Sequence, residues 1–375
     1  MRIAQLANFV GPASGGMRVA LEALARGYAA RGVPRLLVVP GPTDARTTTA
    51  AGEVVQLRAP RVGGGYRLIV EPWRVVDVLE RFAPTSVELS DKTTLLPVTR
   101  WARRQGVRTV LFSHEHLGEM LAGRTGLELG PRLSVGLLNR LLVRSVDAVV
   151  VTSRYAEGEF AALAAGAGCP VVRVPLGVDL ETFTPAGRSA GSVRRDAPLR
   201  LVHVGRLSRE KSPHLAVATA VELHRRGVPV TLDVWGDGPH RDELVALAGD
   251  APVRFGGYVA DRAALGAALA GADVALSVCP TETFGLAVLE ALASGTPVVT
   301  ADTGGACEIV DAASGAWAPA LPGPLADAVL RVAARPEAAR RRAARRRAEL
   351  FTWDRSVERM LAVHAGEPDA VGAAG

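Results

Sequence analysis

Two glutamates, Glu282 and Glu290, have seven residues between them, and Phe284-Gly285 lies inside that interval. The apolar run that starts at Leu286 predicts a short buried helix, which a glycine and a proline end. A loop that turns into a helix N-terminus offers unpaired N–H groups and the positive end of the helix dipole, and both attract phosphate. Two isolated glutamates fit a solvated surface just as well, so the argument for a site needs further residues.

A pair of cations supplies the next argument. The segment LRLVHVGRLSREKSP predicts a buried strand with Arg206 at its exit and Lys211 in the loop before the next helix. Two cations on one strand-exit loop can neutralise the charge that develops on a diphosphate leaving group. Together with the predicted helix N-terminus at Gly285, they predict that the chain binds a nucleotide diphosphate-sugar, with Glu290 and Glu282 contacting sugar hydroxyls.

The N-terminus has a second glycine-rich turn. A predicted strand over 3–9 is followed by a glycine loop that includes Gly15 and Gly16, and then by an amphipathic helix. This loop matches neither the P-loop pattern nor the G-x-G-x-x-G fingerprint, which disfavours an ATPase and a nicotinamide dehydrogenase. Alone, the loop indicates only a tight connection.

Several spaced motifs resemble one known family. The motifs are G-R-L-x-x-E-K, E-x7-E with Phe-Gly inside it, EALASGTPVV and a Gly-Gly-x-x-Glu, and they follow one another between Gly205 and Glu308. They resemble the retaining glycosyltransferases of family four, and in particular actinobacterial-type α-mannosyltransferases. The resemblance implies the GT-B architecture: an α/β chain with two Rossmann-like domains that face a central cleft, and a C-terminal helix that crosses back to the first domain.

The resemblance also implies roles for individual residues. It implies His114, Arg206, Lys211 and Glu282 as the catalytic group, with His114 against the donor sugar. It further implies donor contacts from these residues: Gly15, Gly16, Tyr258, Val259, Phe284, Gly285, Leu286 and Glu290. Glu115, His116 and the strand exit at Ser90-Asp91-Lys92 have weaker claims. Without the resemblance, His114 is equally compatible with a histidine that caps a strand end.

The predicted domains follow from length and pattern. A chain of 375 residues exceeds one hydrophobic core. We expect an acceptor-side domain over 1–185, a donor domain over 186–350, a crossing-back helix over 351–366 and a disordered tail over 367–375. Residues 42–65 predict loops around one short strand, and the arginines of 340–347 predict a solvated helix face.

Charge and composition restrict the setting. The net charge of +6 comes entirely from residues 1–185, which hold 22 Lys+Arg against 16 Asp+Glu, while residues 186–375 hold 22 of each. Weak association with an anionic membrane surface and an arginine-rich composition without a partner explain this excess equally well. Three scattered cysteines and the lack of a long apolar run indicate a cytoplasmic protein, peripheral to the inner membrane face if it associates at all. Nucleic acid is not expected as a partner.

The predicted activity is transfer of a sugar to an acceptor hydroxyl with retention of the α configuration. No Asp-x-Asp occurs in the sequence, so we expect no metal and no other cofactor. GDP-mannose is the favoured donor and a UDP-sugar is the alternative. The acceptor can be a lipid, a glycan or a small metabolite. A nucleotide-sugar epimerase and an inactive binding homologue are the rival interpretations.

Overall fold

A computed structural model describes residues 1–8, 15–62, 66–90, 92–114, 129–187 and 197–367 of the chain. Contacts divide it into two compact units. The first contains the described parts of 1–118, 127–176 and 353–375, and the second contains those of 177–352. The division after Leu176 precedes the predicted boundary at 185, because Phe183 packs into the second unit.

The first unit contains, among its described residues, an eight-stranded sheet with the order β3-β4-β2-β1-β5-β6-β7-β8. All neighbours are parallel except β3, which forms an antiparallel hairpin with β4. Only the strand at β4 was predicted; β3 was missed because its sequence, ARTTT, has no apolar alternation. The strands are β1 (Ile3–Leu6), β2 (Arg35–Gly41), β3 (Ala45–Thr49), β4 (Gly52–Arg58), β5 (Ser86–Leu89), β6 (Arg108–Phe112), β7 (Ala148–Val151) and β8 (Val171–Arg173).

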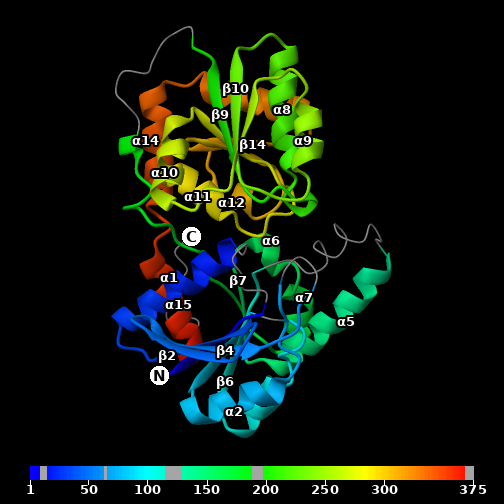
Figure 1. Cartoon of the computed structure of the whole chain (residues 1–375), viewed down its shortest axis with the longest axis vertical. Helices are drawn as coiled ribbons and strands as arrows, with labels where there is room; N and C mark the ends of the chain where they lie inside the picture. The colour runs from blue at the N-terminus through cyan, green and yellow to red at the C-terminus, as the bar shows by residue number, and fades with distance from the viewer. Residues whose placement is uncertain (9–14, 63–65, 91, 115–128, 188–196, 368–375) are drawn as a thin grey trace. The chain divides into compact units, whose positions relative to one another are not determined.

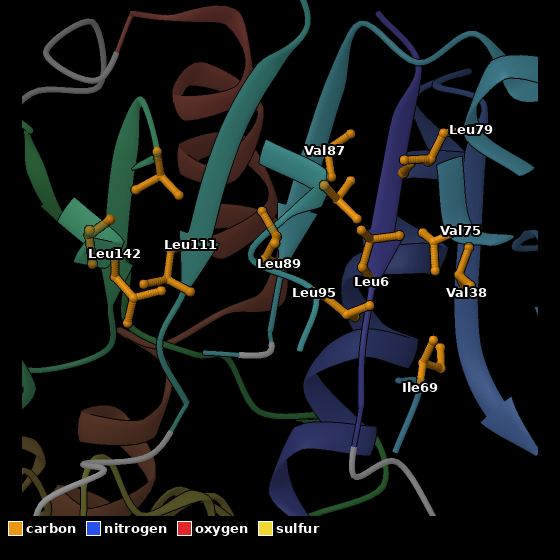
Figure 2. Close-up of a cluster of buried hydrophobic side chains, with 14 of the residues drawn as sticks. Leu6, Val38, Ile69, Val75, Leu79, Val87, Leu89, Leu95, Leu111 and Leu142 are labelled. Carbon is orange, nitrogen blue, oxygen red and sulfur yellow. The ribbon is translucent and has the colours of Figure 1, made fainter. Parts of the chain in front are cut away.

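One face of this sheet supports the main apolar core of the unit. Val75 and Leu79 of α2 point toward Leu6 and Val38 of the central strands (Figure 2). Because parallel strands are covered on both faces, their side chains are apolar in near-continuous runs. The described helices of the unit are α1 (Gly16–Ala30), α2 (Pro72–Phe82), α3 (Val98–Arg104), α5 (Leu129–Ser145), α6 (Arg154–Glu157), α7 (Ala161–Ala167) and α15 (Trp353–Ala365).

The C-terminal helix α15 belongs to this first unit. Its Val357 lies against Gly27 of α1, where a Cβ at position 27 would overlap the valine side chain. His364 of α15 contacts Glu88 of β5 at 3.2 Å and Ser86 at 2.8 Å, and both the His364 and Glu88 side chains are fully buried. These polar contacts fix α15 on the sheet.

The second unit is a six-stranded parallel sheet with the order β11-β10-β9-β12-β13-β14, counted over its described residues. In Figure 1, α8 and α9 lie on one side of these strands and α10, α11 and α14 on the other. The strands are β9 (Leu199–Val204), β10 (Val230–Trp235), β11 (Val253–Gly257), β12 (Val274–Ser277), β13 (Val298–Ala301) and β14 (Gly315–Ala318). The helical elements are the 3-10 turns η2 (Pro185–Gly187) and η3 (Arg209–Lys211), and the helices α8 (Pro213–Arg225), α9 (Arg241–Ala248), α10 (Arg262–Gly271), α11 (Leu286–Ala293), α12 (Ala306–Ile309), α13 (Pro322–Ala333) and α14 (Glu337–Ala348).

The arginines of α14 correct one prediction. Four of them do not form a solvated face, because their guanidinium groups donate to backbone carbonyl oxygens. All but one of these carbonyls, that of Phe183, lie at the C-terminal ends of other helices. Arginine is suited to this task because its planar group carries several donors. The acceptors are Ala333 for Arg340, Ala270 and Ala272 for Arg341, Ala293 and Phe183 for Arg345, and Glu308 and Ile309 for Arg347.

No helix among the described residues is long and apolar enough to cross a membrane.

Candidate active site

Three loops meet at the carboxyl ends of neighbouring strands in the second unit. They follow β9, β12 and β13, which are adjacent and parallel in the sheet. The Sγ of Cys279, after β12, donates to the carbonyl of Glu210 at 3.2 Å. The N–H of Gly305, after β13, donates to the carbonyl of Glu282 at 2.6 Å. Ligands of open α/β sheets gather at such strand ends, so this is the expected position of a binding site.

Lys211 and Glu282 form an ion pair across two of these loops. The ammonium Nζ donates to Oε1 at 3.1 Å and to Oε2 at 2.9 Å. The lysine side chain is 40% exposed and the glutamate side chain 16%. Burial raises the pKa of Glu282, but Lys211 and the N–H groups of Phe284 and Thr283 outweigh it, so the pKa lies below its ordinary value. Glu282 is therefore an ionised acceptor at neutral pH.

Arg206 lies on the same β9 loop. Its Nη1 is 3.5 Å from Oε1 of Glu210, and its side chain is about one third exposed. The loop thus presents two cations, Arg206 and Lys211, with a carboxylate beside each of them. A diphosphate that approached this loop would meet both positive groups.

Glycines of the next strand exit shape this loop. Gly236 has φ +135° and lies so close to the carbonyl of Gly205 that a Cβ at position 236 would overlap it. A Cβ on Gly238 would likewise overlap the carbonyl of Leu207. These glycines, in the G-D-G-P segment of residues 236–239, therefore let the backbone pass close to the loop that carries Arg206, where a larger residue would overlap it.

Gly285 starts α11 with φ +101°, a left-handed conformation that favours glycine. Leu286 is the first residue of the helix, and Glu290 is one turn further along. Phe284, immediately before, is buried, and its ring lies 6.4 Å from that of Phe351. Gly285 is buried as well, and Leu286 is half-buried.

Glu290 pairs with Arg262 of α10. The Nη2 of Arg262 donates to Oε1 at 2.8 Å, and the glutamate side chain is 8% exposed while the arginine side chain is 41% exposed. Burial raises the pKa of Glu290, and Arg262 opposes that rise only in part, so the pKa lies above its ordinary value. Sequence analysis missed Arg262; its signal was a basic residue directly after the helix-capping Asp261.

Tyr258 and Val259 follow β11, beside Gly257, whose carbonyl accepts from the N–H of Gly236. Tyr258 is among the exposed large side chains, at 66%. The loop after β11 is therefore hydrogen-bonded to Gly236, which lies against the Arg206 loop. The ring of Tyr258 in this loop is exposed to solvent.

The remaining predicted site residues belong to the first unit. The Nε2 of His114 lies 3.3 Å from Oγ of Ser90, and its ring packs on Phe112 with centroids 4.1 Å apart. Burial lowers the pKa of His114, Glu88 opposes the shift and Lys92 adds a smaller lowering; the resulting pKa is about 4, so the imidazole is neutral at pH 7. Gly15 caps α1 and Gly16 is its first residue, and a Cβ on Gly15 would meet no atom of the described residues within 4 Å. Asp91, Glu115, His116 and the rest of the first glycine loop lie outside the described residues.

The structure thus groups nine of the twelve predicted site residues in the second unit and three in the first. Within the described segments, no three His, Cys, Asp or Glu side chains gather in a way that could hold a metal ion. All three cysteines are free, and Cys169 and Cys279 are buried.

Sequence comparison identifies both units. The family described as "Glycosyl transferase 4-like domain" matches residues 15–177, and "Glycosyl transferases group 1" matches residues 198–335. The chain is 42% identical over 369 residues to a GDP-mannose-dependent alpha-(1-6)-phosphatidylinositol dimannoside mannosyltransferase of Mycobacterium tuberculosis, covering 96% of this chain and 95% of the relative. It is 31% identical over 227 residues to the corresponding monomannoside mannosyltransferase of Mycolicibacterium smegmatis, covering 56% of each chain.

Solved structures agree on the fold. Sucrose-phosphate synthase from Thermosynechococcus elongatus superposes with a TM-score of 0.80 at 21% identity, covering 97% of this chain and 98% of that one. HepE from Anabaena, in complex with UDP and glucose, gives 0.73 at 18% identity, covering 98% and 99%. The two parallel α/β sheets and the relatives together show that the chain belongs to the group 1 glycosyltransferases, enzymes of the GT-B fold.

Proposed function

We propose that the protein transfers mannose from GDP-mannose to a hydroxyl group of a mannosylated phosphatidylinositol, with retention of the α configuration and without a metal ion. The donor and the lipid class are those named for the relative that is 42% identical over nearly the whole chain. The structural observation that carries the proposal is the Lys211–Glu282 pair, because it brings the cationic β9 loop to within 2.9 Å of the loop that leads into α11.

The second unit would bind the donor through its diphosphate. Arg206 and Lys211 supply positive charge, and the N-terminus of α11 at Gly285-Leu286 adds N–H groups and the helix dipole. As the bond between C1 of mannose and the β-phosphate oxygen breaks, its electron pair stays on GDP, and these groups stabilise the new charge. The acceptor oxygen forms the new bond to C1, and its proton passes to a donor phosphate oxygen on the same face.

The carboxylates would hold the two sugars of the donor. Glu282, ionised at neutral pH, accepts hydrogen bonds from hydroxyl groups of the transferred mannose. Glu290 accepts hydrogen bonds from the ribose hydroxyl groups. Tyr258 and Val259 would lie against the base. His114 is neutral, so it would offer the sugar a hydrogen bond without a charge, while Gly15 and Gly16 let the backbone of α1 approach a ligand.

We also infer a weak contact between the first unit and anionic membranes, which would place the enzyme at the inner membrane face. Helix α5 contains no acidic residue, and its Leu137 and Leu141 are exposed beside Arg140 and Arg144. Exposed leucines next to arginines suit an interface with anionic lipid. Sedimentation with anionic vesicles should exceed that with neutral vesicles, and Leu137→Gln with Leu141→Gln should remove the difference. Equal sedimentation of the parent protein with both vesicles would contradict the inference.

The activity is tested with a panel of GDP- and UDP-sugars and a phosphatidylinositol mannoside acceptor. We expect a mannosylated lipid from GDP-mannose only, with an α linkage by NMR. Transfer from a UDP-sugar alone, an epimerised donor without transfer, or binding without turnover would each overturn the proposal in a distinguishable way.

A further inference from the structure

We propose that Arg262 is a positioning residue that fixes the Glu290 carboxylate for the ribose hydroxyls of the donor nucleotide. This inference rests on the proposed function, because Glu290 is assigned to the ribose there. Arg262 itself would not contact the donor. The direct observation is the 2.8 Å contact from Nη2 of Arg262 to Oε1 of Glu290.

The contact engages only half of the carboxylate. Among the described residues, Oε2 of Glu290 has no hydrogen-bond partner, and it is not fully enclosed by protein atoms. One oxygen is therefore held from the side of α10, and the other stays available as an acceptor. A carboxylate restrained in this way loses less rotamer freedom when it binds a hydroxyl.

Arg262 is in turn fixed by two neighbours. It is the first residue of α10, and Asp261 caps that helix by accepting from the N–H of Ala263. Its guanidinium carbon lies 4.8 Å above the ring of Phe183, which is fully buried. A guanidinium over an aromatic face is attracted by the ring quadrupole, so this contact orients the arginine toward Glu290.

Several contacts hold Phe183 and its neighbouring residues in place below the Arg262 guanidinium. Arg345 of α14 donates to the carbonyl of Phe183 at 2.8 Å and to that of Leu180 at 3.2 Å. Gly266 of α10 lies against the same segment, where a Cβ would meet the carbonyl of Thr182 at 3.0 Å. The chain of contacts therefore runs from α14 through Phe183 and Arg262 to Glu290.

Burial explains why Glu290 needs this partner. A buried carboxyl favours its protonated form, which can accept fewer hydrogen bonds than the ionised form. Arg262 opposes protonation and holds the oxygen pair in one orientation. A purely structural role for Arg262 would affect folding instead, and a direct contact with phosphate would affect every nucleotide equally.

The test compares the affinities of GDP and 2′,3′-dideoxy-GDP by calorimetry. The parent protein should prefer GDP by about tenfold to a hundredfold, the range for hydrogen bonds to a charged group. Arg262→Met keeps a long unbranched side chain without the charge, and should remove most of that preference while leaving the affinity for the dideoxy nucleotide unchanged. Arg262→Lys should retain part of it.

A matched control is Arg241→Met. Arg241 is likewise the first residue of a helix, α9, and its guanidinium lies 5.8 Å above Phe255. Its removal should leave the preference intact. In Arg262→Met, raising the pH should restore part of the preference, because Glu290 then ionises without its partner.

The two hypotheses fail separately. If Glu290→Gln leaves the preference for GDP unchanged, the assignment of Glu290 to the ribose is wrong. If Glu290→Gln removes the preference but Arg262→Met does not, or if Arg262→Met weakens both nucleotides equally, the positioning role is wrong.

Discussion

The chain has only two lysines among its 44 basic residues, one in each unit, and each pairs with a glutamate. Lys92 contacts Glu159 at 3.0 Å, with side chains 9% and 2% exposed. Lys211 contacts Glu282 at 2.9 Å, with side chains 40% and 16% exposed. The two pairs have the same chemistry and nearly the same length, and they differ in their access to solvent.

We expect that difference to separate a structural pair from the pair that we propose binds the donor. Glu159 also accepts from Asn139 at 3.1 Å, and Lys92 lies 5.0 Å above the ring of Phe160, so the first pair is enclosed. In the second pair, the Glu282 side chain is mostly buried, while the Lys211 side chain is partly exposed to solvent. We therefore expect an incoming phosphate to contact the Lys211 cation and not the buried Lys92.

Replacement of each lysine by methionine tests the contrast most strongly. Lys92→Met leaves Glu159 buried and without its cation, and should lower the free energy of unfolding by about 3–5 kcal/mol. Lys211→Met leaves Glu282 its backbone N–H partners and partial hydration, so its loss should be about 1 kcal/mol or less. Guanidinium denaturation measures both values. Equal losses would mean that the two pairs do not differ as their exposure indicates.

Arg206→Ala tests the β9 loop, which carries Lys211 of the partly exposed Lys211–Glu282 pair. It should slow mannose transfer by the equivalent of about 2.7–4 kcal/mol, the effect of removing one charge-stabilising donor. Its midpoint of thermal unfolding should stay close to that of the parent, because the side chain is partly exposed. Turnover near the parent rate would show that Arg206 does not stabilise the leaving group.

The pH dependence of stability at His114 tests the buried surroundings of Lys92. The folded pKa of His114, about 4, lies below the usual value of 6.5, and Lys92 contributes to that depression after burial. As the pH falls below 6.5, the unfolded chain therefore binds a proton at this histidine before the folded chain does. The contribution of the neutral ring to the free energy of unfolding is complete above pH 6.5 and is lost as the pH falls toward 4. The free energy of unfolding of His114→Gln should fall less over this window than that of the parent. Parallel curves would contradict the depressed pKa.

The smallest expected effect is that of a chelator. If Arg206, Lys211 and the α11 N-terminus supply the charge, EDTA should leave the rate of transfer unchanged. Loss of activity that manganese restores would assign that task to a metal instead.

Sequence reasoning identified the local features well. The spacing of Glu282 and Glu290 around Gly285, and the cations of the β9 loop, depend on neighbouring residues. The helix does begin at Leu286, and Lys211 contacts Glu282 at 2.9 Å, while the binding roles of these residues stay predictions. Sequence reasoning could not predict contacts between distant segments. The Lys211–Glu282 and Arg262–Glu290 pairs join residues 71 and 28 positions apart.

The arginines of α14 show the same limit. Their sequence resembles that of a solvated helix, since alternating arginine and alanine give no strong apolar face. Their acceptors are helix ends that only the folded unit brings near. The β3–β4 hairpin was missed for another reason, because its edge strand β3 is fully exposed and lacks an apolar pattern.

The central claim is that the Lys211 cation binds the donor diphosphate, and amine labelling tests it directly because the chain has two lysines. Reductive methylation with and without saturating GDP-mannose is followed by mass spectrometry, with the N-terminal amine as reference. We predict that Lys211 is modified in the free protein and protected by GDP-mannose, while Lys92 is unmodified in both samples. Equal modification of Lys211 with and without the donor would contradict the account.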